Sequence, residues 1–420
     1  MKKRRSDEAT QRRRENNRKA AFGKWIGALL GVAVVLGAAG CANRHEKSVS
    51  AANERWLSMR SAQMLALSTQ QFEVGDLKQA EKTVSEALAF DPENAHLHLL
   101  AGRILLEHGK LERSYHMLDR AIELDPQLAR AHYYQGLVSQ RWQQYDDALS
   151  RYERAYELEA DNVAYLLAVG EMLVALDRSD EALARFEEKT IYFEQNAGLR
   201  EAIGQLYSMR GEHERAVDYF RQAALLRPDD LQLTEELALA QLTAGQVKEA
   251  VPLLERLCAD VDHGDRAYLH RALITAYRLS GRIEDARSTC AVMTRKDPSD
   301  VEAWQLMAEL AWGQEDLSAA LTAAGRVCKL APQRPQGWVM AGLVWQKRGR
   351  TDRALGHFKR GANADKTNAE AAILHGLALE DLGRPEAAAK SYRVALTRDP
   401  QDARARQLLA RVERPGPAVP

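Results

Sequence analysis

The sequence has 420 residues, of which 45% are hydrophobic and only 6% aromatic, and its 59 Lys and Arg residues balance 59 Asp and Glu residues. The balance is uneven along the chain. Residues 1–24 contain ten basic and three acidic side chains and so carry a net charge of +7, which leaves −7 for the remaining residues. This acidic body argues against nucleic acid as a partner, because binding to phosphates depends on clustered Lys and Arg.

The N-terminal segment has the layout of an export signal. The basic residues 1–24 are expected to stay in the cytoplasm, and they precede an apolar segment, residues 25–41, that contains no charged side chain. This segment ends in Ala38-Ala39-Gly40-Cys41. Small residues before a cysteine resemble the lipobox of bacterial lipoproteins, although Ala38 stands where that family usually has Leu. The resemblance implies that Cys41 is the lipid-attachment residue.

An uncleaved single-span anchor is the alternative to lipidation, although the apolar segment is slightly short for a membrane span of roughly 20 residues. Either anchor would tether the chain to a membrane. The rest of the chain is then expected outside the cytoplasm, on the periplasmic or extracytoplasmic side. Residues 42–60 are mostly polar and are predicted to be a spacer.

Three columns of residues recur from residue 61 to residue 402. Steps of 34 residues from Pro92, with one two-residue insertion, meet Pro at six of ten positions. Twelve residues before each of these positions lies Ala in nine of ten cases, and twenty-four residues before lies Gly or Ala in eight of ten. Small residues at these positions let two helices cross at close range, whereas Pro ends one helix and can open the next.

These columns resemble the tetratricopeptide repeat, whose period is 34 residues. The resemblance implies an all-α fold: a right-handed superhelical solenoid of about ten helix-turn-helix repeats within residues 61–402. Residues 403–413 are predicted to form a capping helix, and residues 414–420 a disordered tail. The predicted repeats are 61–94, 95–128, 129–162, 163–196, 197–230, 231–264, 267–300, 301–334, 335–368 and 369–402.

The sequence lacks the common motifs of catalysis and metal binding. It contains no phosphate-binding Gly loop, no G-x-S-x-G sequence and no H-E-x-x-H sequence. The repeats leave no room for a separate catalytic domain, so we expect a non-enzymatic protein without cofactor or metal. Cys258, Cys290 and Cys328 are expected to be buried free thiols, or Cys258 and Cys290 to form a disulfide.

The family resemblance also implies where partners bind. In tetratricopeptide arrays the first helix of each repeat lines a concave groove, through its second, fifth, ninth, twelfth and thirteenth positions. In the first four repeats these positions carry an apolar strip flanked by three Arg side chains, with Tyr133 near its centre. An apolar strip of this kind suits an extended peptide or a helix. The predicted groove residues are Leu65, Phe72, Leu99, Arg103, Leu106, Arg130, Tyr133, Leu137, Arg141 and Leu167.

Together these features predict a membrane-tethered scaffold of the bacterial cell envelope that binds other proteins or peptides in its groove. The sequence looks like bacterial lipoproteins that help assemble pili, outer-membrane proteins or exported polysaccharide machinery. The alternative is a regulatory or positioning subunit of a separate enzyme complex, such as one for polysaccharide synthesis or export.

Overall fold

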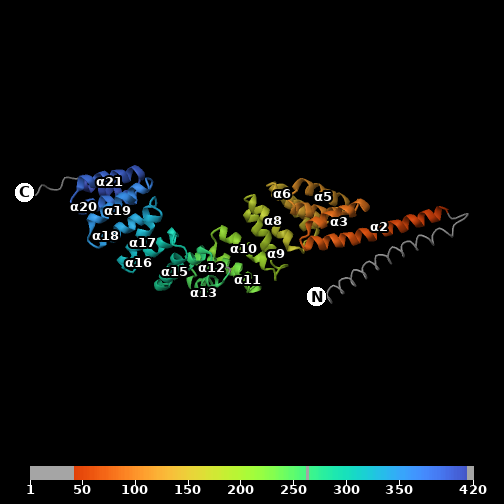
Figure 1. The fold of residues 1–420 in the computed structure, drawn as a ribbon, viewed down its shortest axis with the longest axis horizontal. Helices are drawn as coiled ribbons and strands as arrows, with labels where there is room; N and C mark the ends of the chain where they lie inside the picture. Colours follow the sequence, from red (N-terminus) through yellow and green to blue (C-terminus); the bar gives the residue numbers. More distant parts are fainter. Residues whose placement is uncertain (1–41, 262–263, 414–420) are drawn as a thin grey trace, which may run out of the picture. The chain divides into compact units, whose positions relative to one another are not determined.

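The computed structural model describes residues 42–261 and 264–413, in which every regular element is an α-helix. The all-helical repeat fold predicted from the sequence is therefore confirmed. The predictions for the basic segment, the apolar segment, the lipid on Cys41 and the C-terminal tail lie outside the described residues. The chain divides into two compact units, residues 1–182 and residues 183–420, and each is described by itself (Figure 1).

The first unit consists of successive helices that pack side by side in chain order. Its first helix is long, because residues 42–60, expected as a spacer, continue without a break into the first helix of repeat one. The short helix α9 spans the boundary between the units. The helices are α2 (Ala42–Glu73), α3 (Leu77–Phe90), α4 (Ala95–Glu107), α5 (Leu111–Leu124), α6 (Ala129–Arg141), α7 (Tyr145–Leu158), α8 (Val163–Ala175) and α9 (Ser179–Lys189).

The second unit continues the same alternation of first and second helices. Its last helix, α22, packs on α21. The helices are α10 (Ala197–Met209), α11 (His213–Leu226), α12 (Leu231–Thr243), α13 (Val247–Ala259), α14 (Ala267–Leu279), α15 (Ile283–Lys296), α16 (Val301–Gly313), α17 (Leu317–Leu330), α18 (Pro335–Lys347), α19 (Thr351–Ala364), α20 (Glu370–Asp381), α21 (Pro385–Arg398) and α22 (Ala403–Glu413).

Local side chains set the ends of these helices. Asn94 caps α4 by accepting hydrogen bonds from the backbone of His96 and Leu97, and Asp230 caps α12 in the same way. The turn after each first helix needs a left-handed residue. Gly109 supplies it with φ +70°, and Gln143, at the same place in the next repeat, adopts φ +61°.

In most repeats, a small residue on one helix faces a large residue on the other. A Cβ atom built on Gly376 would lie 2.4 Å from the Tyr392 ring, so only Gly allows the ring to sit there. Where the first helix carries a larger residue, the second carries a smaller one: Ile274 and Cys290 occupy these two positions in repeat seven, and both are buried in one core cluster. The pairing keeps the core filled despite different side chains.

A hydrogen bond ties five of the first helices, and also the C-terminal helix α22, to the loop that precedes them. The side chain at the fourth position of the helix donates to the backbone carbonyl six residues earlier, at distances of 2.8–3.2 Å. Since this carbonyl belongs to the loop before the helix, the bond helps to fix the angle at which these helices begin. The donors are His98, His132, His270, Trp304, Trp338 and Arg406.

The cysteines of the second unit are free thiols. Cys290 and Cys328 are buried and Cys258 is half-buried. Burial raises the pKa of Cys290 to about 12 and those of Cys258 and Cys328 to about 11. Among the described helices, none is both long enough and apolar enough to cross a membrane.

Candidate protein-interaction surfaces

The first unit carries an arginine held between two aromatic rings from neighbouring repeats. The guanidinium carbon of Arg103 lies 4.6 Å from the ring centroid of Phe72 and 4.9 Å from that of Tyr134. The three side chains come from α2, α4 and α6, the first helices of three successive repeats, and each is partly exposed. Cation–π contacts of this kind stabilise an otherwise mobile side chain. We call these three residues the arginine stack.

Tyr133, the centre of the predicted strip, is a packing residue rather than an exposed anchor. Its ring centroid lies 5.1 Å from that of Tyr165 and 5.4 Å from those of Tyr134 and Tyr152. Burial raises the pKa of the Tyr133 hydroxyl, and the neighbouring Tyr134 contributes to the shift. The half-buried Tyr133 side chain therefore joins α6 to α7 and α8 at the edge of the core.

Two other predicted groove residues are buried in the core. Leu99 is 5% exposed and Leu106 is 3% exposed, so neither side chain can be offered to a partner. Their positions face the neighbouring first helix, because α4 packs against α6 as well as against α5. Arg141 reinforces this contact, since its Nη1 donates to the Leu106 carbonyl at 3.1 Å.

The remaining predicted residues differ in exposure. Leu65, Leu137 and Leu167 are half-buried, and Arg130 is exposed. The predicted strip is thus narrower than the sequence indicated. All the predicted residues except Leu99 and Leu106 are at least partly accessible, including Phe72 and Arg103 of the arginine stack.

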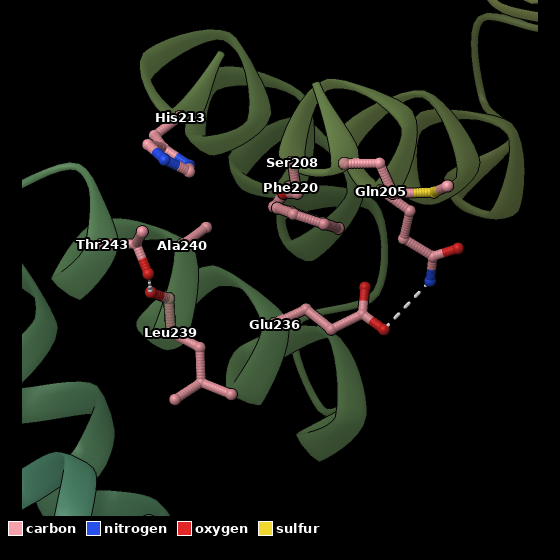
Figure 2. Close-up of a pocket in the computed structure, with 9 residues that line it drawn as sticks. Gln205, Ser208, His213, Phe220, Glu236, Leu239, Ala240 and Thr243 are labelled. Carbon is pink, nitrogen blue, oxygen red and sulfur yellow. Dashed lines mark hydrogen bonds between the residues drawn. The ribbon is translucent and has the colours of Figure 1, made fainter. Parts of the chain in front are cut away.

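A pocket of about 460 Å³ lies in the second unit, outside the predicted groove residues. Its walls come from the first helices of repeats five and six, α10 and α12, and from α11 (Figure 2). Small side chains at Ser208 and Ala240 leave the space open between larger ones. The lining residues are Gln205, Ser208, Met209, His213, Phe220, Glu236, Leu239, Ala240 and Thr243.

One carboxylate in this pocket is incompletely satisfied. Glu236 Oε1 accepts a hydrogen bond from Gln205 Nε2 at 3.1 Å, whereas Oε2 is buried with no hydrogen-bond partner. Burial raises the pKa of Glu236, and the negative charge of Glu201 adds to the rise. The amides of Gln205 and Gln232 oppose it, although the Gln232 amide does not reach hydrogen-bonding geometry with Oε2.

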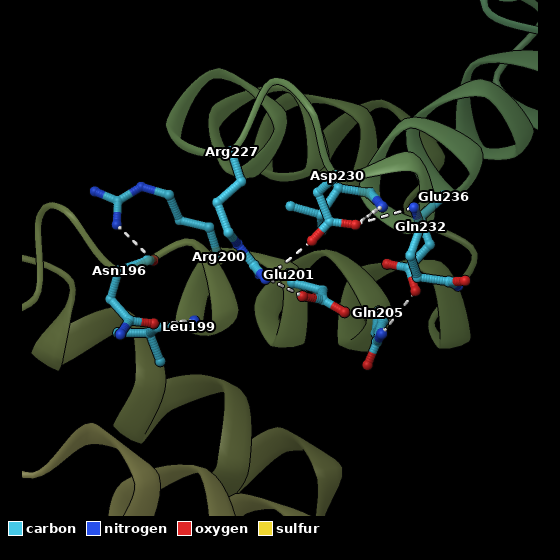
Figure 3. A network of polar contacts seen from close by, with 10 residues as sticks. Asn196, Leu199, Arg200, Glu201, Gln205, Arg227, Asp230, Gln232 and Glu236 are labelled. Atoms are coloured by element: carbon cyan, nitrogen blue, oxygen red, sulfur yellow. Dashed lines mark hydrogen bonds and ion pairs between the residues drawn. The ribbon is translucent and has the colours of Figure 1, made fainter. Parts of the chain in front are cut away.

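The neighbouring carboxylates already have cationic partners. Arg227 bridges Glu201 and Asp230, with nitrogen–oxygen distances of 3.0 Å to each (Figure 3). Glu235 is 6% exposed and pairs with Arg266 at 2.7 Å, while the Tyr268 hydroxyl also donates to it. Among the described residues, no Lys or Arg forms an ion pair with Glu236.

Glu236 is not among the residues predicted from the sequence, and it lies next to Glu235 on α12. Gln205, Ser208, Met209, Leu239 and Thr243 do occupy the ninth, twelfth and thirteenth positions that the family resemblance assigns to the groove. These repeat positions were the sequence signal that could have indicated the pocket. What it could not show is that two small side chains from different repeats leave a hollow beside a carboxylate.

The helix pairs, the left-handed turns and the matched small and bulky positions define a helical-repeat protein. Models of the tetratricopeptide repeat match residues 71–140, 199–234 and, in overlapping matches, 306–369, 346–403 and 373–414. The chain is a tetratricopeptide repeat protein. A model of the bacterial transcriptional activator domain matches residues 219–295. No curated protein sequence matches the chain significantly.

Several solved structures are similar to the chain at low identity. A tetratricopeptide repeat protein from Parabacteroides merdae is 14% identical, with 76% of this chain and 99% of that chain covered and a TM-score of 0.42. YrrB, described as a TPR protein with an unusual peptide-binding site, is 22% identical over 41% of this chain and 89% of its own, with a TM-score of 0.34. The APC/C hetero-tetramer Cut9–Hcn1 is 13% identical, with 89% of this chain and 94% of that chain covered and a TM-score of 0.37.

Proposed function

We propose that this chain is a membrane-tethered scaffold of the bacterial cell envelope that holds partner proteins on the first-helix faces of its repeats. Tetratricopeptide repeat proteins are protein-interaction scaffolds, and their fold is typically non-enzymatic. The observation that carries the proposal is the arginine stack. It presents two aromatic rings and a guanidinium from three successive repeats, and aromatic and Arg side chains are the types that most often dominate interfaces.

The stack is suited to binding because it is organised before a partner arrives. Arg103 Nε lies buried without a hydrogen-bond partner, so the contacts to Phe72 and Tyr134 hold the guanidinium in place. A side chain already fixed in one conformation loses less entropy on binding. An apolar or acidic segment of a partner laid across α2, α4 and α6 would contact all three side chains.

The test is site-specific photocrosslinking of the full-length chain in intact cells of the bacterium that produces it. A benzoylphenylalanine at position 72 should yield discrete adducts, and the same group at Lys82, exposed on the second helix α3, should not. Mass spectrometry of the adducts identifies the partner. Equal yields at both positions would show that the first-helix face is not a specific interface, and a catalytic polypeptide as sole adduct would favour the subunit of an enzyme complex.

The tether is tested separately. The motive is the sequence around Cys41, where small residues follow an uncharged apolar segment. Cys41→Ser should abolish incorporation of labelled fatty acid while leaving the photocrosslinking chemistry intact. A mature protein that begins at Met1 and remains in the membrane fraction would support the single-span anchor, and a protein found only in the soluble fraction would overturn the tether.

A further inference from the structure

The pocket between α10 and α12 combines a buried acceptor with apolar walls. Glu236 Oε2 has no hydrogen-bond partner, and the other oxygen of the same carboxylate has a single one, Gln205. A buried polar atom without a partner costs about 1–3 kcal/mol. A cation bound in the pocket beside this carboxylate would offset part of the cost, because it neutralises the charge.

The walls of the pocket fit an aliphatic stem. Phe220, Leu239 and Met209 line the pocket with apolar atoms, and the smaller side chains of Ser208 and Ala240 lie among them. Met209 is 66% exposed, so the pocket opens to solvent beside it. Lys and Arg side chains have this combination of an apolar stem and a charged end. The lining thus has a carboxylate where the charged end would lie and apolar atoms where the stem would lie.

The surrounding charges favour a cation at Glu236. Glu201 and Glu235 flank it, and burial together with the Glu201 charge raises the Glu236 pKa. Arg227 is engaged with Glu201 and Asp230 (Figure 3). Arg266 is engaged with Glu235. The carboxylate that faces the pocket is therefore the one that the protein's own cations leave unpaired.

We propose that this pocket binds an arginine or lysine side chain of a partner protein, with the Glu236 carboxylate accepting from the cationic end and Phe220, Leu239 and Met209 enclosing the stem. This inference rests on the proposed scaffold function and adds the chemistry of one partner residue. It places a second contact point in repeats five and six. The partner segment would carry a basic side chain displayed from an extended or helical backbone.

The test uses small probes in place of a partner. The full-length chain, labelled with ¹³C at the methionine methyl groups, is titrated with n-butylguanidinium, n-butylammonium and n-butylurea, the last being a neutral analogue of the first. The Met209 methyl signal is assigned by its loss in Met209→Leu. Both cations should shift it saturably, and n-butylurea should bind about tenfold more weakly, which corresponds to about 1.4 kcal/mol.

Two variants separate the carboxylate from the pocket. Glu236→Gln keeps the acceptor for Gln205 and removes the charge, so it should weaken the binding of both cations about tenfold and leave that of n-butylurea unchanged. Glu214→Gln, at an exposed position of α11 outside the pocket, should bind all probes as the parent does.

Three outcomes would overturn the inference: no saturable shift of Met209, equal binding of n-butylurea and n-butylguanidinium, or unchanged cation binding in Glu236→Gln. None of these depends on the photocrosslinking at position 72. Specific adducts at that position together with a failed titration would retain the scaffold function and reject the basic-side-chain pocket.

Discussion

The ring of Tyr152 lies directly against Gly136, where a Cβ atom would fall 2.7 Å from ring atoms Cδ1 and Cε1. The two residues belong to the first and second helix of repeat three. The same two positions hold Gly and Phe in repeats five and nine, Gly and Tyr in repeat ten, and Ala and Ala in repeat eight. The volume at one position is therefore compensated at the other in most repeats, whereas repeat eight has a small residue at both.

Gly136→Ala should destabilise the protein although Ala is the better helix former. The new methyl group would displace the Tyr152 ring, and overpacking of this kind costs about 1–3 kcal/mol. Gly356→Ala is the matched control, because Gly356 lies in α19 with no atom within 4 Å of the added carbon, and there Ala should stabilise by about 0.5–1 kcal/mol. Thermal unfolding followed by circular dichroism measures both, and a higher midpoint for Gly136→Ala would contradict the packing described.

Ile274 and Cys290 should be replaceable together by Ala and Leu at a smaller loss of stability than the two single replacements predict. Cys290→Leu alone overpacks the site and should lower the free energy of unfolding by about 1–3 kcal/mol. Ile274→Ala alone leaves a cavity and should lower it by about 2–5 kcal/mol. The double variant recreates the pair found in repeat six, Ala238 and Leu254, which are both fully buried. Urea unfolding should therefore show a double variant that is less destabilised than the sum of the two single variants. Strict additivity would mean that the two positions do not share a space.

Tyr133→Ala should lower stability rather than act only on binding. The ring contacts three other tyrosine rings, so its removal leaves a cavity between α6, α7 and α8. Because the side chain is half-buried, we expect a loss of about 2–3 kcal/mol, below the roughly 3–5 kcal/mol of a fully buried aromatic. Arg130→Ala, exposed on the same helix, should melt with the parent. A parent-like melting temperature for Tyr133→Ala would contradict the packing role and favour the predicted role in partner binding.

Glu236→Gln should raise stability at neutral pH. The folded-state pKa of Glu236 is raised, chiefly by burial, so the fold favours the protonated carboxyl. The contribution of Glu236 to the free energy of unfolding is therefore fully present below the unfolded-state pKa. It is lost as the pH rises through the folded-state pKa, because the carboxyl then ionises in the folded protein. The parent therefore carries a cost at pH 7 that the uncharged Gln variant avoids. Melting curves should differ at pH 7 and converge near pH 4, and a variant that is less stable than the parent at pH 7 would contradict this reasoning.

The fold was predictable from the sequence because its constraints repeat. Each repeat needs small residues where its helices cross and a left-handed residue between them, so Ala148, Ala216 and Gly109 recur as members of columns spaced by 34 residues. The hydrogen bonds from residues such as Trp304 to the preceding loop were not predicted. They join a fourth-position side chain that differs in chemistry from repeat to repeat, and therefore forms no single-residue column.

The candidate surfaces were only partly predictable. The family register placed Phe72 and Arg103 on the first-helix face, and both lie in the arginine stack. The same register placed Leu99 and Leu106 there, where the neighbouring helix covers them, because exposure depends on how closely successive first helices approach. Glu236 escaped notice since a carboxylate on a helix is usually solvated, and only the packing around it shows that one of its oxygens is buried.

The continuous helix α2 has a geometrical consequence for any tether near its start. Residues 42–60 extend the first helix of repeat one by about 28 Å, at about 1.5 Å per residue. A helix also turns by about 100° with each residue, so it transmits direction as well as length. Removing one residue from this extension would lower the first repeat by little more than an ångström but would swing its binding face through more than a quarter turn. The length of the extension thus sets the rotation of the arginine stack about the helix axis as well as its distance from the start of α2.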